Sequence, residues 1–246
     1  MNYTNRRSIR SYRKDPIDEQ HLSAILRGAL RASNTGNMQT WSVVVTRDPA
    51  KKAALAPCHF GQPMVEAAPV VLTFCLDYNR LEKWCQASGA QGVHYDSLMA
   101  VYVATIDTII AAQNAAVAAE DLGLGICFLG TAVYNMQGII DILKLPRGVV
   151  PVTTITMGWP DQLPPLTERL PLEALVHQEE YCERSPEEVR ALYRDIEANP
   201  ANQAFVRENS KEALAQVFCE VRYSPESYRQ FSAKMLEALR AQGFAV

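Results

Sequence analysis

Residues 98–125 of this 246-residue chain read LMAVYVATIDTIIAAQNAAVAAEDLGLG. Apolar side chains occupy every face of the helix predicted from Leu98 to Leu122, and Gly123 and Gly125 end it. Polar residues interrupt the apolar run too often for a membrane span: Asp107, Gln113, Asn114 and Glu120. The pattern therefore predicts a helix that is buried in a core or at a subunit interface.

Helical and strand patterns alternate on both sides of this helix. Before it, Asp18 can cap a helix, and further segments follow: strands at 41–45 and 69–76, short helices at 49–56 and 81–87. After it come a strand at 126–129, a helix at 135–143, a strand at 149–157 and an extended arm at 160–171. The remainder is helical, with a capping box at Ser185–Glu188 and a last helix that begins after Ser224.

Alternation of this kind is typical of a doubly wound parallel sheet. However, no strand is followed by G-x-G-x-x-G or by G-x-x-x-x-G-K-[ST]. A dinucleotide-binding fold and a P-loop both lack their fingerprint, so an anion would have to be bound by other residues.

The composition is that of an ordinary globular protein, with 48% hydrophobic and 21% charged residues. The length suits one α+β domain or at most two small ones. A net charge of −3 gives no electrostatic reason to expect binding to nucleic acid or to an acidic membrane face. Arg6, Arg7 and Arg10 open the chain without a following apolar run, which predicts no secretory signal.

Six cysteines are scattered along the chain, and none forms a C-x-x-C pair. This distribution predicts reduced thiols in a cytoplasmic protein. Cys58 and His59 are adjacent, but neighbouring residues rarely chelate together and no second ligand pair stands at suitable spacing. The sequence therefore predicts no metal site.

The N-terminal run Arg6-Arg7-Ser8-Ile9-Arg10 concentrates three guanidinium groups and a hydroxyl. In an extended segment Arg6, Ser8 and Arg10 project to one side. Guanidinium groups bind phosphate oxygens bidentately, and the hydroxyl adds a donor, so this face suits a phosphate. The alternative is a solvated basic N-terminus.

A second polar cluster, SNTGNMQTW at residues 33–41, lies between a predicted helix and a predicted strand. The carboxamides of Asn37 and Gln39 can each donate and accept, as the edge of a heteroaromatic ring requires. The alternative is a helix-ending turn in which Asn37 only tolerates an unusual backbone angle.

Taken together, these motifs resemble those of the FMN-dependent nitroreductase family. They are R-R-S-I-R-x-Y from Arg6, S-x-x-x-N-x-Q-x-W from Ser33, A-A-Q-N with L-G-L-G in the long helix, Gly130, and G-W-P at 158–160 leading to Arg169-Leu170-Pro171. The resemblance covers about Asn5 to Tyr181. It implies an α+β fold with a central, mostly antiparallel sheet flanked by helices, and an intertwined homodimer. Residues 1–181 would form the FMN-binding domain, and residues 182–246 a helical extension that acts as a dimer arm.

The resemblance also implies which residues bind the cofactor. Arg6, Arg7, Ser8 and Arg10 would bind the FMN phosphate and ring edge, Asn37 and Gln39 the ring or ribityl chain, Phe128, Leu129 and Gly130 would approach the ring, and Arg169 would return to the phosphate. This chain departs from the family pattern at Thr167, where relatives often have a basic residue, and at Thr131, where they often have a second glycine.

In relatives, the segment that corresponds to residues 77–96 covers the flavin face. Trp84 and Tyr95 could therefore stack on an aromatic substrate, and His94 could donate to a nitro or quinone oxygen. The alternative for Trp84 is that it packs a surface helix onto the core. Cys127 could lie near the flavin, although a small buried thiol is the simpler interpretation.

The implied function is an FMN-dependent oxidoreductase that takes electrons from NADH or NADPH and reduces nitroaromatics, quinones or similar small acceptors by ping-pong hydride transfer. The flavin would carry the chemistry, so no catalytic side chain is predicted. Two alternatives stay open: a same-fold flavoenzyme with dehydrogenase, dehalogenase or flavin-modifying activity, and a non-catalytic flavin- or anion-binding protein. A preference for NADPH would require a cationic pocket for the 2′-phosphate, for which Arg207, Arg222 and Arg229 are candidates.

Overall fold

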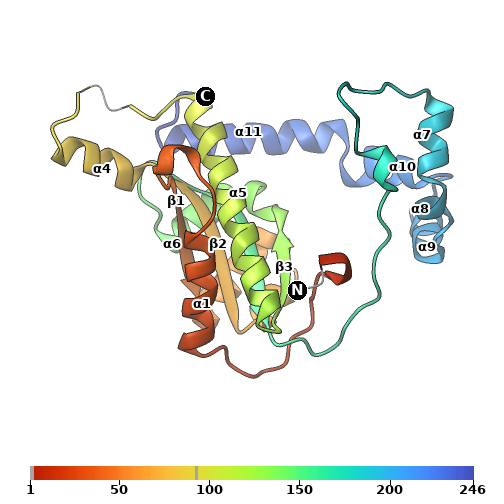
Figure 1. Cartoon of the computed structure of the whole chain (residues 1–246), viewed down its shortest axis with the longest axis horizontal. Coiled ribbons are helices and arrows are strands. Elements are labelled where there is room, and N and C mark those ends of the chain that lie inside the picture. The colour runs from red at the N-terminus through yellow and green to blue at the C-terminus, as the bar shows by residue number, and fades with distance from the viewer. Residues whose placement is uncertain (1–2, 92–93) are drawn as a thin grey trace. The chain divides into compact units, whose positions relative to one another are not determined.

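A computed structural model describes residues 3–91 and 94–246 (Figure 1). The chain divides into two compact units: the first comprises the chain up to Pro165 together with Phe231–Val246, and the second comprises Leu166–Gln230. The predicted functional division into residues 1–181 and 182–246 stays a prediction.

Four strands of the first unit form one sheet within the described residues. They are β1 (Trp41–Thr46), β2 (Val70–Asp77), β3 (Gly125–Leu129) and β4 (Val149–Gly158), in the order β1-β2-β4-β3. Every neighbouring pair is antiparallel, which confirms the predicted antiparallel sheet and excludes the parallel arrangement that the alternation alone would suggest. Each strand begins and ends within one residue of its predicted range.

Two helices cover the first face of the sheet. α1 (Glu19–Leu30) begins at Asp18, whose carboxylate accepts from the His21 amide as predicted, and α5 (Leu98–Asp121) lies beside it (Figure 1). A Cβ on Gly28 would lie 2.8 Å from the Ala118 Cβ, so the two helices approach each other closely there. The core between these helices and the sheet includes Ile25, Phe74, Ile126 and Ile155.

α5 is long and apolar enough, by length and composition, to cross a membrane. Its alanines Ala111, Ala112, Ala115 and Ala119 are nevertheless buried in the core against the sheet and α1. The helix is therefore the central helix of the core, as its interrupting polar residues predict.

Short elements cover the second face of the sheet. These are α2 (Pro49–Leu55), η3 (Ala56–His59), α3 (Met64–Ala67), η4 (Gly130–Val133) and α6 (Met136–Leu143). Their apolar side chains share a core with Ile9 and Tyr12 of the N-terminal segment, which follows η1 (Tyr3–Asn5). The N-terminal segment is thus part of the fold rather than a free extension.

A third core lies around the N-terminal half of α5. It joins Tyr78, Leu81 of α4 (Asn79–Ala87), Ala104, Leu239 of α11 (Pro225–Ala241) and Phe244. The end of the chain therefore belongs to the first unit.

The second unit consists of short helices and an extended arm. Its elements are η5 (Leu172–Ala174), α7 (Pro186–Leu192), α8 (Arg194–Ala198), α9 (Pro200–Glu208), α10 (Leu214–Gln216) and the π-helical η6 (Val217–Arg222). The predicted capping box is present: the Glu188 amide donates to Ser185 Oγ and the Ser185 amide to Glu188. The buried core of this unit consists of Val206, Leu214 and Val217.

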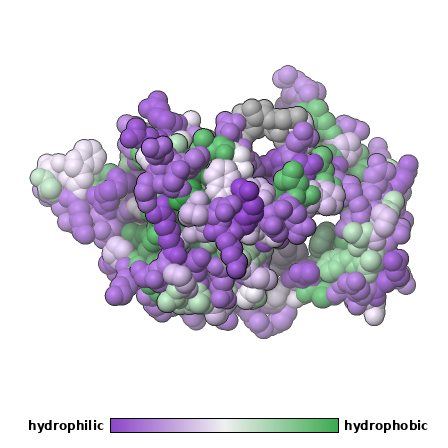
Figure 2. All heavy atoms as spheres, turned by 90° about the horizontal axis from the view of Figure 1, so that it is seen from below, coloured by the Kyte–Doolittle hydropathy of each residue, from purple (hydrophilic) through white to green (hydrophobic). Residues whose placement is uncertain are grey.

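Apolar side chains are also found at the surface. The face shown in Figure 2 is largely hydrophilic, with hydrophobic residues in small separate groups. The most exposed large apolar residues of the second unit include Tyr181 and Leu172, at 78% and 76%.

Candidate functional site

The N-terminal segment lies along the edge of the sheet formed by β3. The Ile9 amide donates to the Ile126 carbonyl at 2.9 Å, and the Arg13 amide donates to the Trp159 carbonyl at 2.9 Å. Tyr12 forms an isolated bridge with Pro160. The predicted phosphate-binding residues are therefore held beside β3 and the end of β4.

Two glycines make room for this segment. Gly125 and Gly158 face each other across the β3–β4 pair. A Cβ on Gly125 would lie 2.5–2.8 Å from three carbons of the Ile9 side chain, and a Cβ on Gly158 would lie 2.8 Å from Tyr12 Cδ1. The Tyr12 hydroxyl donates to the Ile9 carbonyl at 2.7 Å, so the residue packed on Gly158 is hydrogen-bonded to the residue packed on Gly125. These glycines fix the position of the arginines on both sides of Ile9.

Two of the three arginines are partly enclosed. The Arg6 side chain is 30% exposed, and its Nε lies 3.5 Å from Glu120 Oε1 at the end of α5. Arg6 and Arg7 line a cavity of about 340 Å³ together with Gln113 and Glu120. The alternative of a freely solvated basic N-terminus is therefore wrong for Arg6 and Arg7, whereas Arg10 is exposed and Ser8 is half-buried.

Arg6 and Arg10 both lie close to the Cys127 thiol. Burial raises the pKa of this thiol, and the charges of Arg10 and Arg6 oppose that rise. Cys127 is 2% exposed, which confirms it as a buried thiol. Burial likewise raises the pKa of Glu120, and Arg6 opposes it. The cavity therefore combines the cationic Arg6 and Arg7 with the carboxylate of Glu120, whose pKa is raised.

The predicted ring-binding residues lie in a loop that we call the carboxamide loop, residues 34–40, which contains η2 (Thr35–Asn37). Asn37 and Gln39 both have a φ of 54°, in the left-handed region, so the unusual backbone angle considered for Asn37 is present. The Gln39 amide donates to Asn34 Oδ1 at 3.2 Å, and Asp107 of α5 accepts from the Thr35 amide at 3.0 Å. Asp107, which the sequence marks only as an interruption of an apolar run, thus contacts the candidate site.

Phe128, Leu129 and Gly130 lie where β3 ends and η4 begins. Leu129 is buried in the second-face core, and Phe128 lies with its ring centroid 6.0 Å from Arg6 Cζ. Gly130 is exposed, and a Cβ built on it would meet no atom within 4 Å. The backbone at Gly130 is therefore open to a flat ligand.

Thr131, one of the departures from the family pattern, forms a hydrogen bond with a buried histidine. His59 Nδ1 lies 2.8 Å from Thr131 Oγ1, and the ring of His59 is fully buried. Burial lowers the pKa of His59 to about 4. Because the neutral ring links η3 to η4, His59 supports the segment beside Gly130. The sequence signals this residue only through its position next to Cys58.

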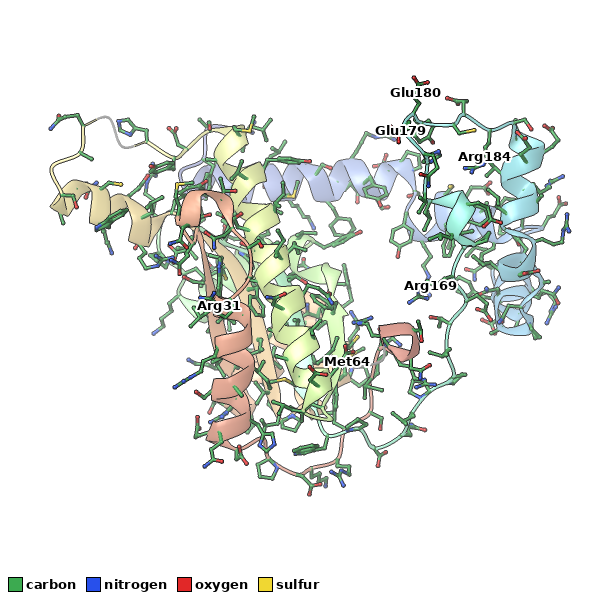
Figure 3. All side chains as sticks on the ribbon, viewed as in Figure 1. Arg31, Met64, Arg169, Glu179, Glu180 and Arg184 are labelled. Atoms are coloured by element: carbon green, nitrogen blue, oxygen red, sulfur yellow. The ribbon has the colours of Figure 1, made fainter. Side chains whose placement is uncertain are left out.

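Arg169 lies in the second unit, on the extended segment before η5 (Figure 3). Its Nη1 donates to Thr167 Oγ1 at 2.7 Å and to the Glu168 carbonyl at 2.9 Å. Thr167, the other departure from the family pattern, therefore orients this guanidinium locally. The binding role of Arg169 stays a prediction.

The three substrate candidates have different environments. Trp84 is 66% exposed on α4, so the alternative that it packs this helix onto the core is wrong; Leu81 does so. Tyr95 stacks on the buried Tyr78 at a centroid distance of 4.8 Å, whereas His94 is exposed. Residues 92–93 of this segment lie outside the described residues.

Within one chain the two binding clusters lie at different levels of α5. The carboxamide loop is attached to Asp107 and Arg6 to Glu120, which is 13 residues further along the helix. At 1.5 Å per residue this separates the two anchors by about 20 Å. The structure therefore brings Arg6, Arg10 and Phe128 together, but not these residues with Asn37 and Gln39.

Comparison with known proteins supports the motif assignment. Residues 3–159 match the sequence profile described as the Nitroreductase family. The chain is 31% identical to an FMN reductase [NAD(P)H] of Bacillus subtilis over 99% of this chain and 96% of that one. It is 35% identical to an oxygen-insensitive NADPH nitroreductase of Salmonella typhimurium over 71% of each.

A solved structure from Bacteroides fragilis superimposes with a TM-score of 0.96 at 47% identity, over 98% of both chains. The profile match spans the N-terminal arginines, the carboxamide loop, the central helix and Gly130, and so covers the candidate site except for Arg169. The chain belongs to the nitroreductase family.

Proposed function

We propose that the chain is an FMN-dependent oxidoreductase that takes electrons from NADH or NADPH and reduces nitroaromatics, quinones or similar electron-poor acceptors. The observation that carries this proposal is the arrangement at β3. Partly enclosed arginines lie beside an edge strand that ends in an open glycine. Relatives named FMN reductase [NAD(P)H] and NADPH nitroreductase support the same cofactors.

The residues present fit FMN. Arg6, Arg7, Ser8 and Arg10 would bind the phosphate, since guanidinium groups can bind its oxygens bidentately. The backbone at Phe128, Leu129 and Gly130 would lie against the ring, where a Cβ at Gly130 would otherwise stand. Asn37 and Gln39 would hydrogen-bond the ring edge or the ribityl chain, and Arg169 would add a further cation.

Bound FMN would supply the redox chemistry, accepting a hydride from the nicotinamide and passing reducing equivalents to the acceptor. The side chains named above bind and orient, and none is required to transfer a proton. Since donor and acceptor would occupy the same place in turn, ping-pong kinetics are expected. Trp84, His94 and Tyr95 are the proposed substrate contacts.

We further propose that the protein is a homodimer that shares its flavin sites. An exposed apolar stripe on α5 supports this: Leu98, Met99, Tyr102, Ile106 and Ile109 are between 42% and 68% exposed. A second copy would cover the stripe and set its own carboxamide loop near the first chain's arginines. The small buried core of the second unit also fits a segment that is completed by a partner.

The six cysteines, all within the described residues, are free thiols, which supports the proposed cytoplasmic location.

An absorbance spectrum followed by anaerobic titration tests the function. The purified protein should be yellow and should bleach with NADH or NADPH, then regain colour with a nitroaromatic or quinone. A yellow protein that does not bleach would indicate a flavin carrier. A colourless protein that cannot be reconstituted would favour an anion-binding module and contradict the proposal.

Sedimentation tests the assembly. A flavin-loaded species of 27.4 kDa at sub-micromolar concentration would contradict both the dimer and the shared site.

A further inference from the structure

We propose that Asp107 and Arg80 are positioning residues that hold the carboxamide loop in the backbone shape needed to present Asn37 and Gln39 to the flavin ring. This inference rests on the proposed function, because it concerns how those two carboxamides reach their ligand. Neither residue would touch the flavin.

Asp107 binds the start and the end of the loop at once. Its Oδ1 and Oδ2 accept from the Thr35 amide at 3.0 and 3.1 Å, and Oδ1 also accepts from the Thr35 hydroxyl at 3.0 Å. Oδ2 accepts from the Thr40 hydroxyl at 3.2 Å. The carboxylate is 1% exposed and Thr40 is fully buried. Four contacts from one buried group thus fix both ends of a seven-residue loop.

Arg80 binds backbone carbonyl groups at the end of the loop. Its Nη2 donates to the Gln39 carbonyl and, at 3.4 Å, to the Trp41 carbonyl. The Arg80 amide donates to Asp77 Oδ1 at 3.1 Å, which anchors the residue at the end of β2. The guanidinium therefore ties the end of the loop to the sheet.

The loop needs such anchors because its backbone is unfavourable. Asn37 and Gln39 both adopt the left-handed region, which is uncommon for residues other than glycine. Asparagine tolerates this region, but glutamine needs support from surrounding contacts to stay in it. A released loop would return to extended or right-handed conformations. Since the direction of a side chain follows its backbone, both carboxamides would then point elsewhere.

A purely structural role for Asp107 in α5 is the competing interpretation. It predicts that Asp107→Leu, which leaves the buried Thr40 hydroxyl without its acceptor, lowers the stability of the first unit as a whole and raises exchange throughout it rather than selectively in the loop. The two interpretations therefore differ in what happens to residues 34–40 when α5 stays intact.

Hydrogen exchange on flavin-free protein is the first test, and it is independent of the proposed function. Asp107→Leu should speed exchange in the peptide that covers residues 33–41 by about tenfold or more, as expected when a charged hydrogen bond is lost. The matched control is Thr108→Val, since the Thr108 hydroxyl donates to the Ala104 carbonyl within α5 at 2.6 Å. Unchanged exchange in Asp107→Leu would overturn the proposal.

Ligand binding is the second test. Asp107→Leu should lower the affinities for FMN and for riboflavin by the same factor, about tenfold, because the loop would contact the ring and not the phosphate. Thr108→Val should weaken neither. A loosened loop with unchanged flavin affinity would overturn the positioning role. Failure of wild-type protein to bind any flavin would instead remove the proposed function and leave the exchange result intact.

Arg80→Met provides a second test if Asp107→Leu does not fold. Because Arg80 is exposed, its replacement leaves the buried core intact. It should reproduce both effects, and Arg80→Lys should recover part of each, since an ammonium can donate to one of the two carbonyl groups. Equal behaviour of wild type and Arg80→Met in both assays would contradict the role of Arg80.

Discussion

The contact between Ile9 and Gly125 predicts the result of adding a single methyl group to the sheet. Gly125 does not have a positive φ, so alanine fits its backbone and only packing is changed. The new Cβ would lie 2.5 Å from Ile9 Cγ1 and 2.6 Å from Ile9 Cβ. Because contacts this short are not sustained, Gly125→Ala must displace Ile9 or the strand.

The size of the effect follows from the burial of Ile9, which is 4% exposed. Overpacking a buried site costs about 1–3 kcal/mol, and releasing an isoleucine to solvent costs about as much. We therefore expect Gly125→Ala to lower the free energy of unfolding by about 2 kcal/mol. If the segment detaches, Arg6 and Arg10 move with it, and an equal loss in binding corresponds to about 30-fold weaker FMN affinity.

A double-mutant cycle measured by urea denaturation at fixed protein concentration separates packing from other effects. Ile9→Ala alone should cost about 2–5 kcal/mol. When Ile9→Ala is made in the Gly125→Ala protein, the free energy of unfolding should fall by about 1–2 kcal/mol less than it does in the wild type, because the new methyl group occupies part of the vacated space. Gly130→Ala is the control, since a Cβ at this position meets nothing within 4 Å. It should leave the free energy of unfolding unchanged while lowering the affinity for FMN.

Additive effects of Ile9→Ala and Gly125→Ala would refute this reasoning, because the two side chains would then not be in contact. Wild-type stability of Gly125→Ala would refute it more directly. In either case the N-terminal arginines would not be held by the β3–β4 glycine pair.

Three further predictions follow from the same structure. Arg10→Ala or Arg169→Ala should weaken FMN by a few kcal/mol but riboflavin hardly at all, as measured by fluorescence titration; equal losses would show that neither residue binds the phosphate. Burial lowers the pKa of His59 to about 4, below its unfolded value of 6.5, so its contribution to stability is complete above pH 6.5 and is lost as the pH falls toward 4. The loss should be on the order of 3 kcal/mol, and His59→Gln should flatten this part of the stability profile. Trp84→Ala should change acceptor preference more than the rate of flavin reduction in stopped-flow experiments; an equal change in both half-reactions would show that Trp84 does not contact the acceptor selectively.

Local chemistry explains why most elements could be predicted from the sequence. Asp18 and Ser185 cap helices through bonds to amides three residues away, and such contacts depend on neighbouring residues alone. Apolar periodicity likewise locates α5 and the buried strands. The order of the motifs then identified the family and its antiparallel sheet, which alternation of helices and strands by itself would have misassigned.

Tertiary structure alone decided how distant residues meet. Gly125 and Gly158 become a pair only in the β3–β4 register, where their missing side chains make room for Ile9 and Tyr12. Asp107 looks like an interruption of an apolar helix until the chain folds and its carboxylate meets the carboxamide loop. The exposure of Trp84 also depends on which side of α4 faces the core. These properties arise from contacts between residues far apart in sequence, and local patterns carry no record of them.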